Sequence, residues 1–477
     1  MIRRGLKRAC LVLAIYLVYL VIGAMAPFWQ TPALPSGERV SAPVEELLTD
    51  RETPDRAQIL ETNRSAWTER LRLLSRAEES IVMSTFDMRD GESTRDILSV
   101  LYQKAQEGVE VRILVDGISG FLRMGGRPLF ETLQAHPNIE IRLYNPITFW
   151  TVLTPWTTQG RMHDKYIIVD DLAYILGGRN TFDYFIGEYP TDHRSLDREV
   201  LVYNGGHGAP EGRESSLYQV LDYFHQVWNS EACAPYGGTA GEAEQEEVQT
   251  MLQERYDALT AAEPALFDPS YDYAAHTVET QGVTLLSNPT HIYAKEPVLF
   301  AQMMALADRA EESVVLHTPY AVLNDAMADT LAAVAEEVPV TVMLNAVENG
   351  DNVVASSDYR YHRDEVMGTG VQLLEYAGGL SYHGKSMVVD GEIVLIGSYN
   401  LDLRSTYVDT ELMVAVRSPQ LAQELLESME GLHRDCRLAS PEGDTVPDGL
   451  TIPEAPWTRQ AVWTVLGLVL QPFRILV

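Results

Sequence analysis

Two stretches of this chain repeat a His, a Lys two residues later and an Asp five residues after that Lys. The first, residues 161–180, reads RMHDKYIIVDDLAYILGGRN, and the second, residues 382–400, reads YHGKSMVVDGEIVLIGSYN. In both, an Asn follows the His by 17 positions. One such pattern alone is a weak signal. Two with matching tails indicate a duplicated site that combines imidazole and ammonium groups.

The His and Lys of each stretch are spaced to act together. At the start of a strand, positions i and i+2 project from the same face, so His163 and Lys165 would point into one space, as would His383 and Lys385. Two such pairs suit the binding of a phosphodiester. The Lys donors would neutralise its non-bridging oxygens. One His would attack phosphorus and the other would protonate the leaving alkoxide.

The small tails after each stretch are candidate substrate-binding positions. Gly178 and Ser398 allow the backbone to approach a ligand closely, and Asn180 and Asn400 each add an amide donor. Metal ligation is the weaker interpretation, because a Lys between the ligands would repel a cation. We therefore expect neither a metal nor another cofactor.

Four carboxylates complete the predicted site. Asp170 and Asp390 belong to the repeated pattern, and we place them in the catalytic set. Because each lies seven positions after its His, it would point away on a regular strand and is expected at a hairpin turn, where it orients or screens its neighbours. Glu199 and Glu411 precede apolar strands and are candidates to hold an imidazole through its second nitrogen.

A second repeat places these residues on a duplicated α/β unit. Arg76–Thr85 reads RAEESIVMST and Arg309–Thr318 reads RAEESVVLHT. Each is followed by a predicted helix, two apolar strands and one of the His-Lys-Asp stretches, with a mainly parallel sheet expected at the centre. We predict two such domains, at 57–230 and 276–440, joined by a linker and surface helix at 231–275.

The N-terminus predicts a membrane anchor over residues 1–30. Ala9–Ala26 carries no charge over 18 residues, or about 27 Å of helix, close to the thickness of a bilayer core. Ala24–Ala26 also resembles a signal-peptide cleavage site, but Pro27 suits cleavage poorly, and we favour an uncleaved anchor. The preceding basic residues would stay cytoplasmic and put the body outside. Residues 31–56 are interpreted as a tether.

The C-terminus is also apolar. Residues 455–477 are too interrupted, at Pro472, to span a bilayer. We expect a segment lying in the membrane interface with Trp457, Trp463 and Arg474 as anchors. The alternative is a terminal segment packed on the body.

Composition narrows the classes of partner. The formal net charge is −32, which argues against nucleic-acid binding because that needs a basic surface. A small anionic substrate in a locally basic pocket is still compatible with it. Three cysteines exclude a dense disulfide framework, and the sequence leaves open whether Cys233 and Cys436 pair.

The motifs HDKYIIVD with GGRN, and HGKSMVVD with GSYN, resemble the paired motifs of the phospholipase D superfamily. The segments HPNIEIRLYNPITF, GGRNTFDYF and GSYNLDLRSTYVDTE resemble its bacterial cardiolipin synthase branch, especially the C-type members. The resemblance covers about residues 60–435. It implies two duplicated α/β/α domains about a pseudo-twofold axis.

The resemblance also implies a reaction at a membrane. A phosphatidyl group would pass to His163, with His383 as general acid, and then to an alcohol on a second phospholipid to give cardiolipin. The symmetry of the two motifs leaves the order of the histidines open from the sequence itself. Hydrolysis of the lipid and transfer to another alcohol are the alternatives, and a nuclease is disfavoured by the acidic charge.

Overall fold

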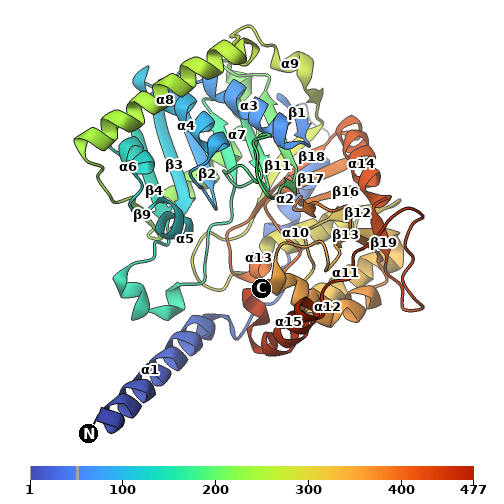
Figure 1. Cartoon of the computed structure of the whole chain (residues 1–477). Coiled ribbons are helices and arrows are strands. Elements are labelled where there is room, and N and C mark those ends of the chain that lie inside the picture. The colour runs from blue at the N-terminus through green and yellow to red at the C-terminus, as the bar shows by residue number, and fades with distance from the viewer. Residues whose placement is uncertain (1, 50–52) are drawn as a thin grey trace.

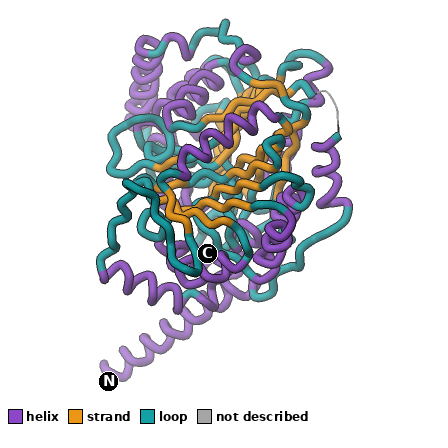
Figure 2. Tube along the Cα trace, turned by 90° about the vertical axis from the view of Figure 1, so that its right-hand side faces the viewer, coloured by secondary structure: helices purple, strands orange, loops and turns teal. Residues whose placement is uncertain are grey.

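The two internal repeats fold as two mixed sheets, each covered by helices (Figure 1). The structure is a computed structural model that describes residues 2–49 and 53–477. Figure 2 shows the strands gathered at the centre, with helices outside them and the N-terminal helix projecting from the body. The predicted duplicated α/β fold is confirmed.

The first sheet has nine strands in the order β10-β1-β8-β6-β5-β2-β3-β4-β9. Its parallel strands, β2, β3 and β4, lie toward one edge, and the remaining neighbours run antiparallel, so the expectation of a mainly parallel centre is wrong. The strands are β1 (Asp55–Leu60), β2 (Ser80–Thr85), β3 (Glu110–Asp116), β4 (Ile139–Tyr144), β5 (Tyr166–Val169), β6 (Ala173–Gly177), β8 (Glu199–Asn204), β9 (Cys233–Pro235) and β10 (Val278–Glu279). The main helices are α3 (Asn63–Ser75), α4 (Glu92–Gln106), α6 (Pro128–Gln134) and α7 (Leu217–Trp228).

The second sheet repeats this order in eight strands, β11-β18-β17-β16-β12-β13-β14-β19. Its parallel strands are β12, β13 and β14, which again lie toward one edge. The strands are β11 (Gly282–Ser287), β12 (Val314–His317), β13 (Val340–Asn345), β14 (Gln372–Tyr376), β16 (Ser386–Val389), β17 (Ile393–Gly397), β18 (Leu412–Arg417) and β19 (Cys436–Leu438). The main helices are α10 (Val298–Ala307), α11 (Asp325–Glu337), α12 (Val353–Gly368) and α14 (Pro419–His433).

The two domains share a hydrophobic core. Val200 and Val202 of β8 belong to the same buried cluster as Val394 and Ile396 of β17. These strands are rich in β-branched residues that are buried, as expected where a sheet face packs against another layer. The shared core fixes the two repeats against each other, so that the hairpins carrying the His-Lys-Asp pattern meet in the middle of the molecule.

The linker between the domains contains α8 (Glu242–Ala262), which lies across α4 and α6 (Figure 1). Leu252 and Leu259 bury its inner side. Arg255 bonds Asp96 Oδ1 at 2.6 Å and Glu92 Oε2 at 2.8 Å, which ties the helix to the first domain. The acidic residues at its start stay in solvent.

Residues 31–56 are not a free tether, which corrects the prediction. Residues 38–48 form α2 (Glu38–Leu48), whose Val40, Val44 and Leu47 are buried and pack against α10 and β11 of the second domain. The spacing of these three apolar residues is that of a helix with one buried face. Residues 50–52 lie outside the described residues, and β1 begins soon after, at Asp55.

The N-terminal helix α1 (Ile2–Met25) extends away from the body (Figure 1). Among residues 2–49 and 53–477, the one helical segment long and apolar enough to cross a membrane is Leu6–Phe28. This agrees with the predicted N-terminal membrane helix and supports membrane association.

The C-terminal segment packs on the second domain through α15 (Trp457–Val469) and a 3-10 turn, η7 (Gln471–Leu476). Two of its three predicted membrane anchors are wrong. Trp463 is only 3% exposed, and Arg474 binds the carboxylate of Asp358 at 2.9 Å. Of the three predicted anchors, only Trp457 is exposed. The cysteines Cys10, Cys233 and Cys436 are free thiols.

Candidate active site

The two His-bearing segments each pair with the opposite domain. The backbone N–H of His163 donates to the Thr410 carbonyl at 3.2 Å, and that of His383 donates to the Leu196 carbonyl at 2.6 Å. Around His383 this pairing extends into a two-stranded parallel sheet of β7 (Ser195–Leu196) and β15 (Ser381–Tyr382). Each His is thus set beside the segment that leads into β8 or β18 of the other repeat.

This pairing brings a carboxylate from one domain to the imidazole of the other. Nδ1 of His163 lies 2.8 Å from Glu411 Oε1, and Nδ1 of His383 lies 2.7 Å from Asp197 Oδ2. Both carboxylate side chains have no exposed surface, whereas each imidazole side chain keeps 13% exposed. Because Nδ1 is engaged, Nε2 is the ring nitrogen available to a substrate.

Glu411 lies where an orienting group was predicted, but Glu199 does not. Glu199 binds Arg70 through both carboxylate oxygens, at 2.6 Å each. In the strand register Glu199 is opposite Gly177, as Met413 is opposite Gly397. Counting back two residues from each makes Asp197 the counterpart of Glu411. Asp197 follows Asn180 by 17 positions and Glu411 follows Asn400 by 11, so the strand register, and not the spacing in the sequence, reveals this correspondence.

The two Lys side chains are buried next to their own histidines. Lys165 is 2% exposed and Lys385 is 1% exposed. Each ammonium group donates to the carbonyl oxygen of the His two residues earlier. Burial lowers the pKa of Lys165 to about 7 and that of Lys385 to about 8, although Glu411 and Asp197 act in the opposite direction. Both Lys side chains therefore lie beside their own histidines, although β5 and β16 begin only after Lys165 and Lys385, so the predicted strand geometry does not apply to either pair.

The two imidazole–carboxylate pairs differ in the pKa values of their groups. Burial and the nearby ammonium groups lower the pKa of His163 well below its usual value, and lower the pKa of His383 as well. Burial raises the pKa of Glu411 to about 7. Burial acts on Asp197 in the same direction, but Lys385 and His383 outweigh it and bring its pKa to about 2. One imidazole therefore faces a firmly ionised carboxylate and the other does not.

Asp170 and Asp390 are not near the imidazoles, which corrects their placement in the catalytic set. Asp170 accepts the backbone N–H groups of residues 78–80 at 2.7, 3.0 and 2.6 Å. Asp390 accepts those of residues 311–313 at 2.8, 2.8 and 2.9 Å. Both have positive φ, 48° and 52°, at the tip of their hairpins. They fasten each hairpin to the RAEES segment of the same domain, so the two repeated sequences bind each other.

Gly178 and Ser398 contact the orienting carboxylates rather than a substrate cavity, which corrects their predicted role. A Cβ at Gly178 would overlap the carboxylate of Asp197. Ser398 occupies the matching position of the second repeat, and its hydroxyl donates to Glu411. Ser405 donates to the same carboxylate at 2.7 Å. These residues set the position and the charge of the carboxylates.

Asn180 and Asn400 lie next to the site. Oδ1 of Asn180 accepts the backbone N–H of Asp87 at 3.1 Å, which leaves its amide nitrogen free to donate. Nδ2 of Asn400 is 3.4 Å from the hydroxyl oxygens of Tyr320 and Ser405. Within the described part of the chain, its buried Oδ1 has no hydrogen-bond partner. Both amides are compatible with the predicted substrate-binding role.

Two aromatic residues of the site were missed from the sequence. Phe86 meets the ring of His163 edge-on with centroids 5.1 Å apart, and Phe185 meets that of His383 at 5.0 Å. Each ring therefore packs against one imidazole of the site. Phe86 directly follows the first RAEES strand, which is the only sequence signal that pointed to it.

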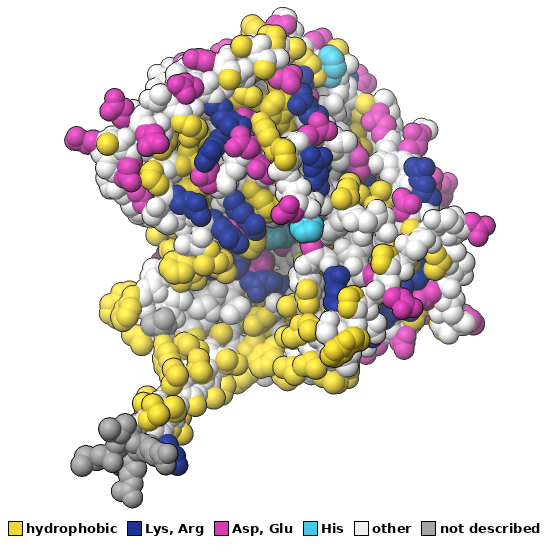
Figure 3. Space-filling model, in the orientation of Figure 1, with side chains coloured by type: hydrophobic (Ala, Val, Ile, Leu, Met, Phe, Trp, Pro, Cys, Tyr) yellow, Lys and Arg dark blue, Asp and Glu magenta, His cyan; other side chains and the backbone are white. Residues whose placement is uncertain are grey.

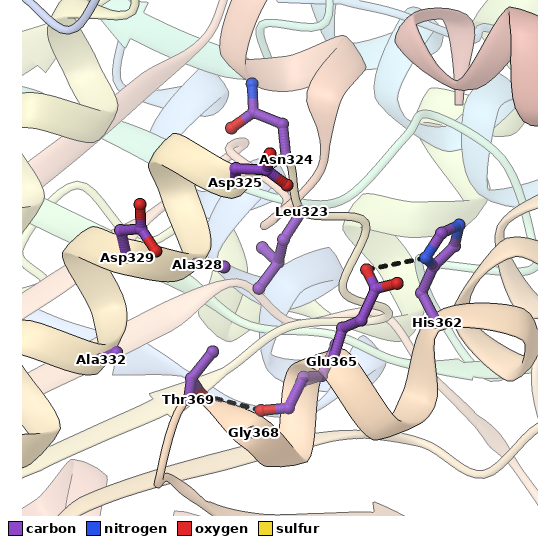
Figure 4. A pocket seen from close by; sticks show the side chains of 11 residues that line it. Leu323, Asn324, Asp325, Ala328, Asp329, Ala332, His362, Glu365, Gly368 and Thr369 are labelled. Carbon is purple, nitrogen blue, oxygen red and sulfur yellow. Dashed lines mark hydrogen bonds and ion pairs between the residues drawn. The ribbon is translucent and has the colours of Figure 1, made fainter.

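A separate cavity of about 320 Å³ lies between α11 and α12 (Figure 4). Its charged lining is Asp325, Asp329 and Glu365, with His362 bound to Glu365 at 2.8 Å. It contains none of the predicted site residues, and its acidic lining does not suit a phosphate. The chemistry therefore belongs to the paired histidines.

Comparison with known proteins agrees with this geometry. A family model described as "Cardiolipin synthase, PLD-like domain" matches residues 71–183 and 303–433, together just over half of the chain. This chain belongs to the PLD-like cardiolipin synthase family. The two matched regions hold one His-Lys pair each. Membership makes the chain a phosphatidyltransferase of the phospholipase D superfamily.

The individual relatives of this chain have low sequence identity to it. Cardiolipin synthase C of Escherichia coli is 26% identical over 407 residues, covering 76% of this chain and 82% of that protein. A cardiolipin synthase of Halalkalibacterium halodurans is 24% identical over 339 residues, covering 71% and 58%. The crystal structure of a phosphatidylserine synthase of Haemophilus influenzae aligns with a TM-score of 0.63 and 14% identity over 92% of this chain and all of that one. This structural match shows that the chain shares its fold with the phosphatidylserine synthase.

The crossed carboxylates yield a first prediction. Asp197→Asn leaves His383 without an ionised partner, so we expect lipid turnover per folded molecule to fall about 10²–10⁴-fold. The matched control is Glu199→Gln, two residues away. It breaks the buried pair with Arg70 and should cost about 3–5 kcal/mol of unfolding free energy, with turnover per folded molecule within a few-fold of the wild type. Thermal unfolding and specific activity of both variants separate the effects. Equal losses of turnover would contradict the assignment.

Proposed function

We propose that this enzyme makes cardiolipin by transferring a phosphatidyl group from phosphatidylglycerol or another phospholipid to the headgroup hydroxyl of a second phospholipid, here phosphatidylglycerol. The observation that carries the proposal is the pair of imidazoles, each with one nitrogen held by a buried carboxylate and the other left for substrate. The cardiolipin synthases among its relatives support the choice of product.

The first half of the reaction forms a phosphohistidine on His163. Its Nε2 attacks phosphorus, the bond to the headgroup oxygen breaks, and His383 gives its Nε2 proton to the leaving alkoxide. Lys165 and Lys385, with amide donors from Asn180 and Asn400, stabilise the negative charge on the non-bridging oxygens. No residue outside the two repeats is needed for these steps.

The second half transfers the group to the acceptor. The hydroxyl of a second phosphatidylglycerol attacks the phosphohistidine, and His383, now neutral, takes the proton as general base. The P–N bond breaks, and His163 returns to its neutral form. The products over both halves are cardiolipin and glycerol, or cardiolipin and ethanolamine when phosphatidylethanolamine is the donor.

The electrostatic difference between the carboxylates supports the order of the histidines. His163 has its pKa well below the usual value and faces Glu411, whose own pKa is raised to about 7, so it is neutral and nucleophilic. His383 faces Asp197, whose pKa is about 2. A firmly ionised carboxylate stabilises an imidazolium, which a general acid requires. It offsets part of the effect of burial and of Lys385, so the pKa of His383 is lowered less than that of His163.

The body is proposed to face the outside of the cell, with α1 as a single anchor. Arg3, Arg4, Lys7 and Arg8 precede the apolar run, and basic residues are retained on the cytoplasmic side.

The lipid products test the proposed function. Purified full-length protein in vesicles of phosphatidylglycerol, with and without phosphatidylethanolamine, should yield cardiolipin with glycerol or ethanolamine. Phosphatidic acid as the sole product would identify a hydrolase instead. With labelled lipid and quenching in denaturing detergent at neutral to alkaline pH, where the P–N bond survives, His163→Ala should trap no phosphoenzyme, while His383→Ala should accumulate it slowly. Trapping in the His163 variant would reverse the order of the histidines.

A pH profile tests the two lysines. Because the pKa is about 7 for Lys165 and about 8 for Lys385, both ammonium groups lose their protons as the pH rises through this range. We expect kcat/KM, which reports the free enzyme, to fall from about pH 7 upward, where Lys165 loses its proton first, and more steeply above about pH 8. Lys385→Arg should lower the overall rate and make the fall above about pH 8 less steep, since guanidinium stays charged while Lys165 still titrates. A profile that is flat to high pH would exclude cationic lysines as phosphate ligands.

The topology is checked with protease. Protease added outside spheroplasts should digest the body and leave only an N-terminal fragment that contains α1. Protection of the body until the membrane is permeabilised would place it in the cytoplasm.

A further inference from the structure

Two uncharged segments far apart in the sequence lie on the side of the body from which α1 leaves. Residues 149–160, FWTVLTPWTTQG, and residues 461–473, AVWTVLGLVLQPF, contain no charged side chain, in a chain with net charge −32. Figure 1 shows α15 and the teal-green loop on either side of the base of α1. Figure 3 shows hydrophobic side chains gathered over this part of the surface.

The first segment is a loop fixed against α1. It consists of two short 3-10 turns, η3 (Phe149–Val152) and η4 (Pro155–Thr157), and exposes 77% of Phe149 and 68% of Trp150. The hydroxyl of Tyr19 in α1 donates to the Leu153 carbonyl at 2.6 Å. The position of this loop along α1 is therefore set by a direct contact.

That contact gives the depth of the loop relative to a membrane spanned by α1. Tyr19 is six residues before Met25, where α1 ends, which corresponds to about 9 Å of helix. Aromatic side chains are enriched at this interfacial depth, and amphipathic elements bury their apolar faces about 5–10 Å into the same region. The loop thus lies at the level of the headgroup and upper acyl region.

The second segment is a helix with two apolar faces. One face of α15 is buried on α12 through Trp463 and Gly467. The opposite face exposes Val462, Val465, Leu468 and Val469. At 100° per residue these four side chains share one stripe. The packing on α12 accounts for the first face and leaves the second without a protein partner among the described residues.

Both segments are attached to the part of the site that holds His163. Arg404 donates to the Gln159 carbonyl at 2.7 Å, at the end of the loop, and its backbone N–H donates to the Val477 carbonyl at 3.1 Å, after α15. Its Nε bonds Asp409 at 2.9 Å, two residues before Glu411. Arg404 thus links both apolar segments to the part of the chain that holds His163, the loop through its side chain and the C-terminal segment through its backbone N–H.

We propose that the loop and the outer stripe of α15 form a membrane seat, consisting of Phe149, Trp150, Trp156, Val462, Val465 and Leu468, that inserts into the leaflet where α1 ends. The partner is a phospholipid bilayer rather than a second protein, because the seat flanks the membrane helix. The acidic remainder of the surface is repelled by anionic headgroups, so that contact depends on uncharged apolar area. Combined with the proposed function, the seat lets a lipid of that leaflet reach His163 without leaving the bilayer.

Spin labels on the full-length protein test the seat independently of activity. With Cys10 and Cys233 replaced by Ala, labels at Trp150→Cys and Val465→Cys in vesicles of phosphatidylglycerol and phosphatidylethanolamine should collide with oxygen and be shielded from a water-soluble nickel complex. The control Gln253→Cys, exposed on α8, should show the reverse. Nickel access at both seat positions would overturn the proposal. Dipolar broadening at Val465→Cys would overturn it for α15 by revealing a second copy there.

A charge placed in the seat tests its use by the enzyme. Val465→Glu with Leu468→Glu should lower transfer from vesicle lipid about ten-fold relative to transfer from a dispersed short-chain lipid. Val446→Glu, at an exposed apolar position outside the seat, should leave this ratio unchanged. An unchanged ratio in the double variant would show that the seat does not deliver substrate. If the chain makes no cardiolipin at all, the label depths still decide whether the seat is inserted.

Discussion

The constraint on which the site depends is the crossed pairing of each imidazole with a carboxylate of the other domain. Neither repeat contains both members of a pair. Asp197 and Glu411 are fully buried, and burial of an unpaired carboxylate is costly. The shared core of β8 and β17 holds the two domains at the distance these pairs need. The same two contacts therefore belong to the domain interface and to the candidate site. A substitution that breaks one of them disturbs both.

The duplication is symmetric in fold but not in chemistry. Gly178 leaves space for the Asp197 carboxylate, whereas Ser398 at the matching position donates a hydrogen bond to Glu411. The longer Glu side chain receives a further bond from Ser405. The two carboxylates also differ in pKa: burial raises that of Glu411 to about 7 although both Ser hydrogen bonds oppose it, whereas Lys385 and His383 bring that of Asp197 to about 2. A nucleophile and a general acid need such a difference, and a perfectly symmetric site could not supply it.

Much of this arrangement was predictable from local pattern. The repeat of RAEES and of His-x-Lys gave the duplicated α/β fold, and the two-residue spacing put each Lys near its His, although neither pair lies within a strand. The orienting carboxylates were harder, because spacing within one repeat does not say which domain supplies the partner. Glu199 was predicted because it precedes an apolar strand, and that pattern does not single out Asp197. The helix α2 was missed because Pro43 interrupts a sequence whose apolar residues are otherwise spaced for a helix.

The roles of Asp170 and Asp390 were mistaken because a repeated residue need not be catalytic. Their carboxylates accept three backbone N–H groups each, in a hairpin tip of positive φ where Asp is tolerated. They hold each hairpin against the strand that precedes it, and hence hold its His-Lys pair in position. A residue that both repeats contain can therefore serve the fold of the repeated unit as well as its chemistry.

The buried lysines link this scaffold to substrate binding. In the free site their pKa values, about 7 and about 8, are far below that of an exposed Lys, because burial is only partly offset by Asp197 and Glu411. In the proposed reaction a phosphodiester would add a negative charge between them and restore the preference for the ammonium form. Binding and protonation are therefore coupled. The site is most strongly cationic when a phosphate occupies it, which is also when negative charge on the non-bridging oxygens must be stabilised.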